Sequence, residues 1–362
     1  MAYTSRFNFI GELIIPDEQK KPESFIRLWN GGSDKDTGMA RIRFGVKEST
    51  SNSCFVECFG MEYDTIRTRR DDGENIEISW DERFDEDIVK SIPNYRKYIV
   101  DLGELTGGEK QFISQYDFIM YLSEVLPKYN GKVYCSGKFV KSPYNGEVYD
   151  KYTVDTVRES TAKTNSMHVV FDYFWNKDCV DTTEFESTRR ITVDGYIRQY
   201  INKADGEKFF PQRMVMDIGR LEASDDENHK KYAKGLMNWI NIKDKAVMHI
   251  PWDCKVIRGA ETVELDESML TDAQKEQIEC GISTINDFAK PLSENVYEFR
   301  AFKRKLSGDY ADGPIESGYT LDDIQDELFI NPVAKETVAD ISAIVEESAE
   351  DNFDKSLEEL IG

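Results

Sequence analysis

Apolar and polar side chains alternate along several short segments of the first 160 residues, which is the pattern of strands with one buried face. In the segment ARIRFGVKES, Ile42, Phe44 and Val46 alternate with Arg41 and Arg43. A turn-forming stretch, TSNS, separates this segment from the next alternating one, CFVECFGM. The pattern predicts strands over residues 6–15, 40–49, 54–61, 131–142 and 148–158.

A helix is predicted between the third and fourth of these strands. Residues 111–126 carry apolar side chains at helical spacing, and Pro127 ends the run. The last two strands form a hairpin, because Asn145–Gly146 is a strong turn signal. We interpret residues 16–38 as a polar connection and residues 62–110 as a long polar insertion. Three strands, a helix and two strands is the order of a five-stranded Greek-key barrel of the oligonucleotide/oligosaccharide-binding (OB) type.

The second half of the chain repeats this plan in a degraded form. A linker is expected at residues 159–168. After it the sequence predicts a hairpin (189–201 with 208–219), a helix (227–241), a strand (246–260), a second helix (271–282) and a last strand (296–306). The expected fold is therefore mainly β, with two OB-fold barrels in tandem, helical insertions and an acidic C-terminal tail. We assign residues 1–160 to the first domain, 161–319 to a second OB-like domain and 320–362 to the tail.

Charge is concentrated at the C-terminal end. The 362 residues carry a net charge of −23, from 46 basic and 69 acidic side chains, and residues 320–362 alone carry −11. This balance argues against a protein that coats nucleic acid through a generally basic surface, and against an anionic membrane surface as partner. The tail is open to two interpretations. It is a solubilising or amphipathic terminal segment, or an acidic arm that contacts partner proteins or competes with nucleic acid for a basic groove.

Sequence motifs of catalysis are missing. No phosphate-binding loop, nucleophile elbow, zinc-protease motif or dinucleotide fingerprint occurs, and the chain has only three histidines, far apart. Cys54 and Cys58 lie four residues apart on a strand, about 13 Å between backbones, too far to share a zinc ion. We interpret all six cysteines as small apolar residues of a protein in a reducing compartment.

Two acidic segments are candidate cation sites. Residues 34–38 resemble the start of an EF-hand loop but lack its later ligands, which favours a solvated connection. Acids within residues 81–87 could hold Mg²⁺, although such runs are usually solvated helix faces. We expect no enzyme activity, no catalytic residue, no metal and no cofactor. The chain has no signal peptide at its start and no apolar run of membrane-spanning length, so we expect a soluble, cytoplasmic protein.

The stronger signal is a set of aromatic side chains interleaved with basic ones on the predicted strands. Flat rings stack on unpaired bases, at about 1–3 kcal/mol per base, and cations neutralise phosphates. In the first domain the candidate nucleic-acid-binding residues are Arg41, Arg43, Phe55, Phe59, Tyr134, Lys138, Phe139, Lys141, Tyr144, Tyr149, Lys151 and Tyr152. In the second domain they are Arg198, Tyr200, Arg213, Arg300, Lys303 and Arg304. A barrel also needs an apolar core, so some of these rings are expected to be core residues.

The segment from Gly131 to Glu159 resembles the fourth and fifth strands of single-stranded-DNA-binding proteins, which follow the form GxxVYxxGKxxxxxY, a polar turn and a Tyr/Thr/Val strand. CFVECFG is similar to the third strand of that family, and FNFIGEL to the first. The resemblance covers residues 6–158, except that the insertion at 62–110 has no counterpart in short bacterial members. The acidic C-terminus is similar as well, but it ends Leu-Ile-Gly instead of Pro-Phe.

This resemblance implies a bacteriophage-type protein of DNA replication or recombination in the host cytoplasm. It would bind single-stranded DNA by stacking and phosphate contacts, and contact replication or recombination proteins through its tail. Two alternatives remain open from the sequence. One is a structural or adaptor protein whose barrels bind other proteins, and the other is a metal-dependent nuclease that uses the acids at 81–87.

Overall fold

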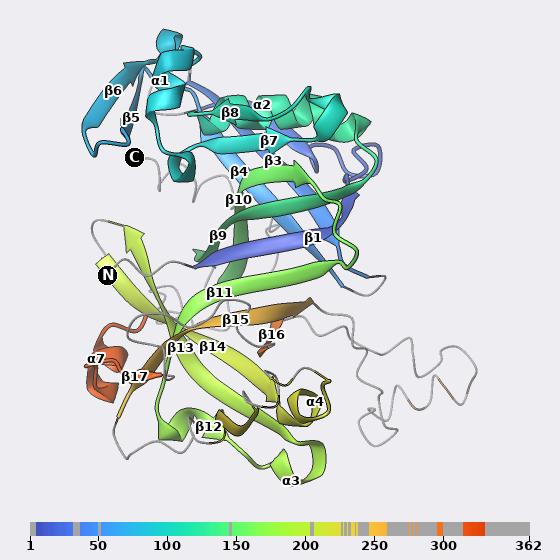
Figure 1. Ribbon diagram of the computed structural model, residues 1–362, viewed down its shortest axis with the longest axis vertical. Coiled ribbons are helices and arrows are strands. Elements are labelled where there is room, and N and C mark those ends of the chain that lie inside the picture. Colours follow the sequence, from blue (N-terminus) through green and yellow to red (C-terminus); the bar gives the residue numbers. More distant parts are fainter. Residues whose placement is uncertain are drawn as a thin grey trace.

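Two sets of strands each close on themselves in the computed structural model, one above the other along the long axis (Figure 1). The structure describes residues 5–31, 37–49, 52–144, 147–202, 206–225, 246–258, 295–299 and 314–329, with isolated positions between 227 and 280. Within these residues the chain is mainly β, as the sequence predicts.

The first circuit contains five strands. β1 (Arg6–Ile14) pairs with β3 (Thr37–Lys47), and β3 pairs with β4 (Ser53–Met61). β4 lies parallel to β10 (Glu147–Glu159), which forms a hairpin with β9 (Lys132–Tyr144), and β9 returns to β1. All pairs except β4–β10 are antiparallel. The five strands predicted in this half are therefore confirmed, and they close into one barrel.

The second circuit repeats the same order of pairing. β11 (Ser166–Trp175) pairs with β13 (Arg190–Asn202), and β13 forms a hairpin with β14 (Gly206–Asp217). β14 lies parallel to β16 (Asn295–Phe299), which pairs with β15 (Met248–Arg258), and β15 returns to β11. In both circuits the first strand pairs with the second and fourth, and the third runs parallel to the fifth.

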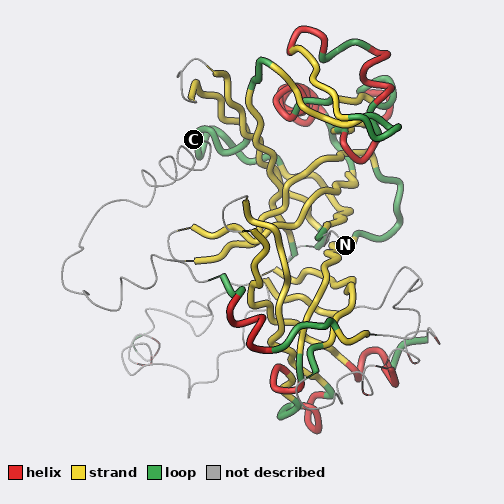
Figure 2. Tube along the Cα trace, turned by 90° about the vertical axis from the view of Figure 1, so that its left-hand side faces the viewer, coloured by secondary structure: helices red, strands yellow, loops and turns green. Residues whose placement is uncertain are grey.

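The two circuits join through their first strands, β1 and β11. These strands run antiparallel, from Arg6 opposite Val170 to Ile10 opposite Ser166, and Figure 2 shows strands continuing from one barrel into the other. Past Gly11, the same edge of β1 pairs with β3 instead. A Cβ atom at Gly11 would collide with the Lys47 carbonyl, so this change of partner requires glycine.

Helix α2 (Gln115–Val125) lies between β4 and β9 in the chain and covers the first barrel (Figure 1). Ser114 caps its N-terminus by accepting a hydrogen bond from the Asp117 N–H. The helix buries Phe118, Ile119 and Leu122 in the core that continues through both barrels. It follows that the helix predicted at 111–126 is confirmed, with a later start at Gln115.

The insertion at 62–110 has a structure of its own. It contains β5 (Thr65–Arg69), β6 (Asn75–Ser79), α1 (Glu86–Ser91), β7 (Tyr98–Asp101) and β8 (Lys110–Phe112). β5 and β6 form a separate two-stranded sheet, and Ile66, Ile78, Ile92 and Ile113 form a small core beneath it. β7 instead extends the first barrel's sheet by pairing with β10.

The polar connection predicted at 16–38 is corrected by the structure. It contains a sixth strand, β2 (Ile26–Gly31), which pairs along β3. Among the described strands β2 pairs only with β3, and its side chains are exposed or only partly buried, which hides the alternation that marks the other strands.

The remaining described elements are short. They are η1 (Trp80–Glu82), η2 (Asn94–Arg96), η3 (Gly103–Leu105), η4 (Leu126–Lys128), η5 (Lys177–Cys179), β12 (Val180–Asp181), α3 (Phe185–Thr188), α4 (Ile218–Glu222), β17 (Ile315–Glu316) and α7 (Leu321–Asp326). Most of the helices predicted at 227–241 and 271–282 lies outside the described residues, as does the strand predicted at 296–306 beyond Phe299. Residues 330–362, most of the acidic tail, lie outside them as well.

Candidate nucleic-acid interface

The outward side of β2, β3 and β4 carries aromatic and basic side chains in register. Along β4, Cys54, Val56 and Cys58 point into the core, so the alternate residues Phe55 and Phe59 point outward. Arg41 and Arg43 of β3 and Arg27 and Trp29 of β2 share this outward side. Arg41 lies opposite Phe59, Arg27 lies opposite Arg41, and Arg43 lies opposite Glu57. We call these six side chains the basic–aromatic face: Arg27, Trp29, Arg41, Arg43, Phe55 and Phe59.

Direct contacts order this face. The rings of Trp29 and Phe59 lie 5.8 Å apart between centroids. The Arg43 guanidinium lies 4.8 Å from the centre of the Phe55 ring, and the Arg27 guanidinium lies 5.2 Å from the Trp29 ring. These cation–π contacts hold the guanidinium groups beside the rings, and the partly buried Arg27 also pairs with Glu23 at 3.2 Å. A stacked base and its phosphate would meet a ring and a cation together.

One ion pair lies within the same row of residues. Across the sheet Arg43 is opposite Glu57, and Glu57 is opposite Thr153 on β10. The Glu57 carboxylate accepts a 2.6 Å contact from the Lys151 ammonium, and both side chains are partly exposed. Lys151 is therefore close to the basic–aromatic face, but its charge is balanced by Glu57.

Behind this face the barrel interior is packed with buried apolar side chains. Cys58 is fully buried, and burial, with a further contribution from the Glu57 charge, raises the pKa of its thiol far above the ordinary 9.0. The thiol therefore stays neutral and packs as an apolar group, as expected from the sequence. Such a core holds the outward side chains of β3 and β4 on a rigid sheet.

Two predicted base-stacking rings belong to the core instead. Phe139 and Tyr152 are 2% and 3% exposed, and their rings stack on each other 5.6 Å apart. Tyr152 also packs edge-on against Phe7 and Phe9 of β1. The prediction that these two rings contact bases is corrected, since each lies on the inward side of its strand.

Lys141 is a second correction. Its ammonium is buried and bonds to Asp150 at 2.6 Å and to Gln212 of β14 at 2.5 Å. Its backbone N–H donates to the Gln199 side chain of β13, and the same side chain donates back to the Lys141 carbonyl. Lys141 therefore joins the two barrels and is not available to a phosphate.

The other candidates of β9 and β10 are spread over the outside of the barrel. Lys138 is exposed, and Tyr149 is 53% exposed near the β9–β10 turn. Tyr134 is half-buried and donates its hydroxyl hydrogen bond to Asn8 at 2.8 Å. The side chain of Tyr144 lies outside the described part of the structure. None of these residues is part of the basic–aromatic face.

The corresponding side of the second barrel is partly covered by the chain itself. Residues 314–329, which we call the strap, pass over β13 and β14, and the backbones of Glu327 and Phe329 bond to Phe209. Ile324 of α7 is buried against Phe209 and Phe174. The folded body therefore extends to Phe329, ten residues into the segment assigned to the tail.

The strap changes the environment of Arg198. Its guanidinium forms ion pairs with Glu207 at 3.1 Å and Glu327 at 3.0 Å, and also donates a hydrogen bond to the Tyr319 hydroxyl. With a side chain only 12% exposed, Arg198 is a strap contact in this structure, which corrects its prediction as an open phosphate contact.

The remaining candidates of the second domain differ in their surroundings. Arg213 pairs with Asp194 through two contacts of 2.7 and 3.1 Å at the surface, and Tyr200 is 58% exposed. Arg300, Lys303 and Arg304 lie outside the described residues. Unlike the candidates of β3 and β4, these residues do not gather on one described surface.

Sequence reasoning missed Arg27 and Trp29, which complete the basic–aromatic face. The available signal was the alternation of Ile26, Arg27, Leu28 and Trp29, four residues long. It was masked because glycines and charges follow it closely, and because Leu28 is 52% exposed instead of buried.

The acidic run at 81–87 has local structural roles. Asp85 caps α1 by accepting hydrogen bonds from the N–H groups of Asp87 and Ile88, and Glu86 pairs with Lys90. Across the ranges that the structure describes, no three His, Cys, Asp or Glu side chains gather closely enough to hold a metal ion. Among those same residues, no helix is long and apolar enough to cross a membrane.

No protein-family model matches the chain, and no curated protein sequence matches it. Among solved structures, the single-stranded DNA binding protein from Thermus aquaticus overlaps with 71% of this chain and 87% of its own, at 6% identity and a TM-score of 0.30. An overlap of this size amounts to a weak likeness at the level of fold.

Proposed function

We propose that the chain is a tandem OB-fold protein, with one barrel in residues 1–160, a second in 161–319 and an acidic tail after them. Support comes from the two strand circuits, which share one order of pairing and one parallel pair, between the third and fifth strands. A helix between the third and fourth strands, as in OB folds, is present in the first barrel as α2.

We further propose that the protein binds single-stranded DNA without chemistry. The observation that carries this proposal is the basic–aromatic face, where three rings and three guanidinium groups share the outside of β2, β3 and β4. In OB folds this side of the second and third strands is the usual surface for oligonucleotides. Rings supply stacking to any base, while the arginines neutralise phosphates, so binding would be tolerant of sequence.

The setting that we propose is DNA replication or recombination of a bacteriophage, in the cytoplasm of the host cell. In that setting a strand-binding protein protects or organises DNA, and the acidic tail contacts replication or recombination proteins. The tail supports this proposal by its composition, since apolar side chains such as Ile344, Phe353 and Leu357 lie between acids and can dock as a short helix.

An adaptor that binds proteins is the second candidate, and one observation favours it. The strap places residues Glu327–Phe329 alongside β14 of the second barrel, with Leu328 bridged to Phe209, so that this strand already accommodates a peptide. A peptide partner on the first barrel would lie along β4, the strand that corresponds to β14. The two candidates make opposite predictions for oligonucleotides.

An electrophoretic shift of a labelled oligo-dT by the full chain tests the proposal directly. Unlabelled single-stranded DNA should compete well, and duplex DNA of equal length should compete poorly because its bases are not free to stack. RNA as a third competitor measures the preference between the two nucleic acids. No shift at micromolar protein would contradict DNA binding and favour the adaptor.

A further inference from the structure

The insertion presents basic side chains on a surface outside the barrels. Along β5, Arg67 and Arg69 alternate with the buried Ile66, so both point away from the small core of the insertion. The Arg67 side chain is 80% exposed. Asp71 and Asp72 lie in the turn that follows β5, whereas Glu77 of β6 lies opposite Arg67.

A shallow hollow lies beside Arg67. It is lined by Arg67, Thr68, Asn75, Ile76, Glu77 and Arg96. Arg96 comes from η2 (Asn94–Arg96), which brings a second guanidinium to the hollow from a different element. The hollow therefore has two cations against one carboxylate, with small polar and apolar groups between them.

An exposed ring accompanies Arg96, one of the residues that line the hollow. Tyr95 is 73% exposed, and the Arg96 guanidinium lies 5.6 Å from the centre of its ring. This ring–cation pair repeats the arrangement of Arg43 with Phe55 on the first barrel. A flat ring held beside a cation at the surface can stack on an unpaired base while the cation meets a phosphate.

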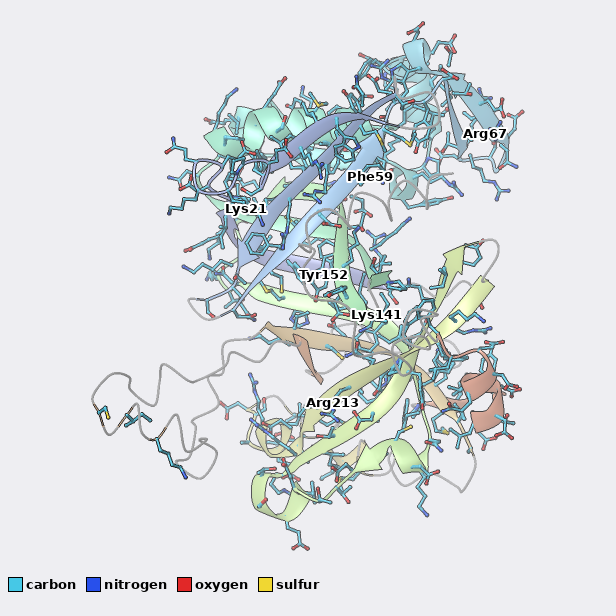
Figure 3. The ribbon with its side chains drawn as sticks, turned by 180° about the vertical axis from the view of Figure 1, so that it is seen from behind. Lys21, Phe59, Arg67, Lys141, Tyr152 and Arg213 are labelled. Atoms are coloured by element: carbon cyan, nitrogen blue, oxygen red, sulfur yellow. The ribbon has the colours of Figure 1, made fainter. Side chains whose placement is uncertain are left out.

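The insertion that carries the hollow begins directly after β4, the strand of Phe55 and Phe59. β4 ends at Met61, two residues beyond Phe59, and only Glu62–Asp64 separate it from β5. In Figure 3, Arg67 is labelled on the insertion, at the end of the molecule where Phe59 is also found, far from Arg213. The small core of four isoleucines gives the hairpin a fixed shape on which these side chains are held.

We infer that the insertion is a second contact site for the same single strand, and that Arg67, Arg96 and Tyr95 bind two phosphates and one base beyond Phe59. This inference depends on the proposed function of the basic–aromatic face. Glu77 is the internal competitor at this site, because its carboxylate lies 2.9 Å from the Arg67 Nε. Both partners are exposed, so the ion pair is weak and a phosphate can replace the carboxylate.

Fluorescence anisotropy with two oligo-dT lengths tests this inference. An oligonucleotide of about 8 nucleotides fits one barrel face, whereas one of about 20 also reaches the insertion. Arg67→Ala with Arg96→Ala should weaken binding of the long oligonucleotide and lower its salt slope by about 1.4, with no effect on the short one. Tyr95→Ala should weaken the long one roughly fivefold or more. Glu77→Gln should strengthen it.

Lys90→Ala is the matched control, since Lys90 lies on α1 of the same insertion, outside the hollow, in an exposed pair with Glu86. It should change neither affinity. Equal binding of the long oligonucleotide by wild type, the double variant and Tyr95→Ala would overturn the inference while leaving the first barrel's role intact. Equal losses on both lengths would also overturn it. If the wild type binds neither length, the proposed function fails and the inference fails with it.

Discussion

At the scale of single residues, burial separates the aromatic side chains into two groups with different roles. Phe139 is 2% exposed within the continuous core, whereas Tyr149, ten residues later, is 53% exposed. Phe139→Ala should lower the free energy of unfolding by about 3–5 kcal/mol, through lost burial and the cavity that remains. Tyr149→Ala should change it by about 0.5 kcal/mol or less. Urea unfolding of both variants measures the difference, and a stable Phe139→Ala protein would contradict the core assignment.

The buried thiol of Cys58 predicts a pH dependence of stability. Its pKa is raised by burial in the folded chain, whereas the unfolded thiol ionises near its ordinary 9.0. The stability that this group contributes is therefore fully present below pH 9.0 and is lost as the pH rises above it, by up to about 1.4 kcal/mol per pH unit.

Urea unfolding at about pH 8 and about pH 10.5 checks this expectation. The free energy of unfolding should fall less between these two conditions for Cys58→Ala than for the wild type. An equal fall in both proteins would mean that the Cys58 thiol ionises in the folded state.

At the scale of elements, the strap decides where the chain can be shortened. Ile324 is 1% exposed against Phe209, and the backbone of residues 327–329 bonds to β14. A chain that ends at Tyr319 should therefore melt roughly 5 °C or more below the full chain. A chain that ends at Phe329 should melt at the same temperature as the full chain. Equal melting of all three would show that the strap does not stabilise the second barrel.

Elements with a clean alternation were predictable, and those stabilised by contacts distant in sequence were not. The strands β1, β3, β4, β9 and β10 each bury one face of side chains in the core, so the period of two is visible in the sequence. Among the described strands β2 pairs only with β3. The β5–β6 hairpin contributes to a core of just four buried isoleucines, two of its own and two from adjoining segments. Neither element therefore shows a strong alternation in its sequence.

The candidate site was predictable to the same extent. Arg41, Arg43, Phe55 and Phe59 follow from alternation on two strands, because the inward residues between them are apolar. Alternation does not reveal which of two faces is inward when both carry rings, and for this reason Phe139 and Tyr152 were misplaced. The interbarrel role of Lys141 depends on Gln199 and Gln212, about 60 to 70 residues away in the chain.

At the scale of the whole molecule, charge opposes the binding of DNA. Of the net −23, residues 330–362 contribute −7, from nine acidic and two basic side chains. An acidic arm tethered to a basic face competes with DNA at roughly millimolar effective concentration. A chain that ends at Phe329 should therefore bind oligo-dT more tightly than the full chain, most clearly at low salt, where screening is weak.

The salt dependence itself separates competition from a solubilising role for the tail. The difference in oligo-dT affinity between the shortened and the full chain should shrink as salt is added, because screening weakens the attraction of the basic face for the tail and for DNA alike. If both chains bind oligo-dT equally at low ionic strength, the tail does not compete, and its role is limited to partner docking or solubility.

On the proposed function, the basic–aromatic face binds single-stranded DNA through rings and guanidinium groups together. Anisotropy titrations of a short oligo-dT test this role. The variants are Arg41→Ala with Arg43→Ala, and Phe59→Ala; the control is Arg220→Ala, on α4 after the second barrel's β14. The arginine variant should lose affinity and about 1.4 of its salt slope, and Phe59→Ala should lose about 1–3 kcal/mol of binding at an unchanged slope. Arg220→Ala should bind as the wild type does. If all proteins are folded and the arginine and Phe59 variants keep the affinity and the salt slope of the wild type, the basic–aromatic face does not bind DNA in this way.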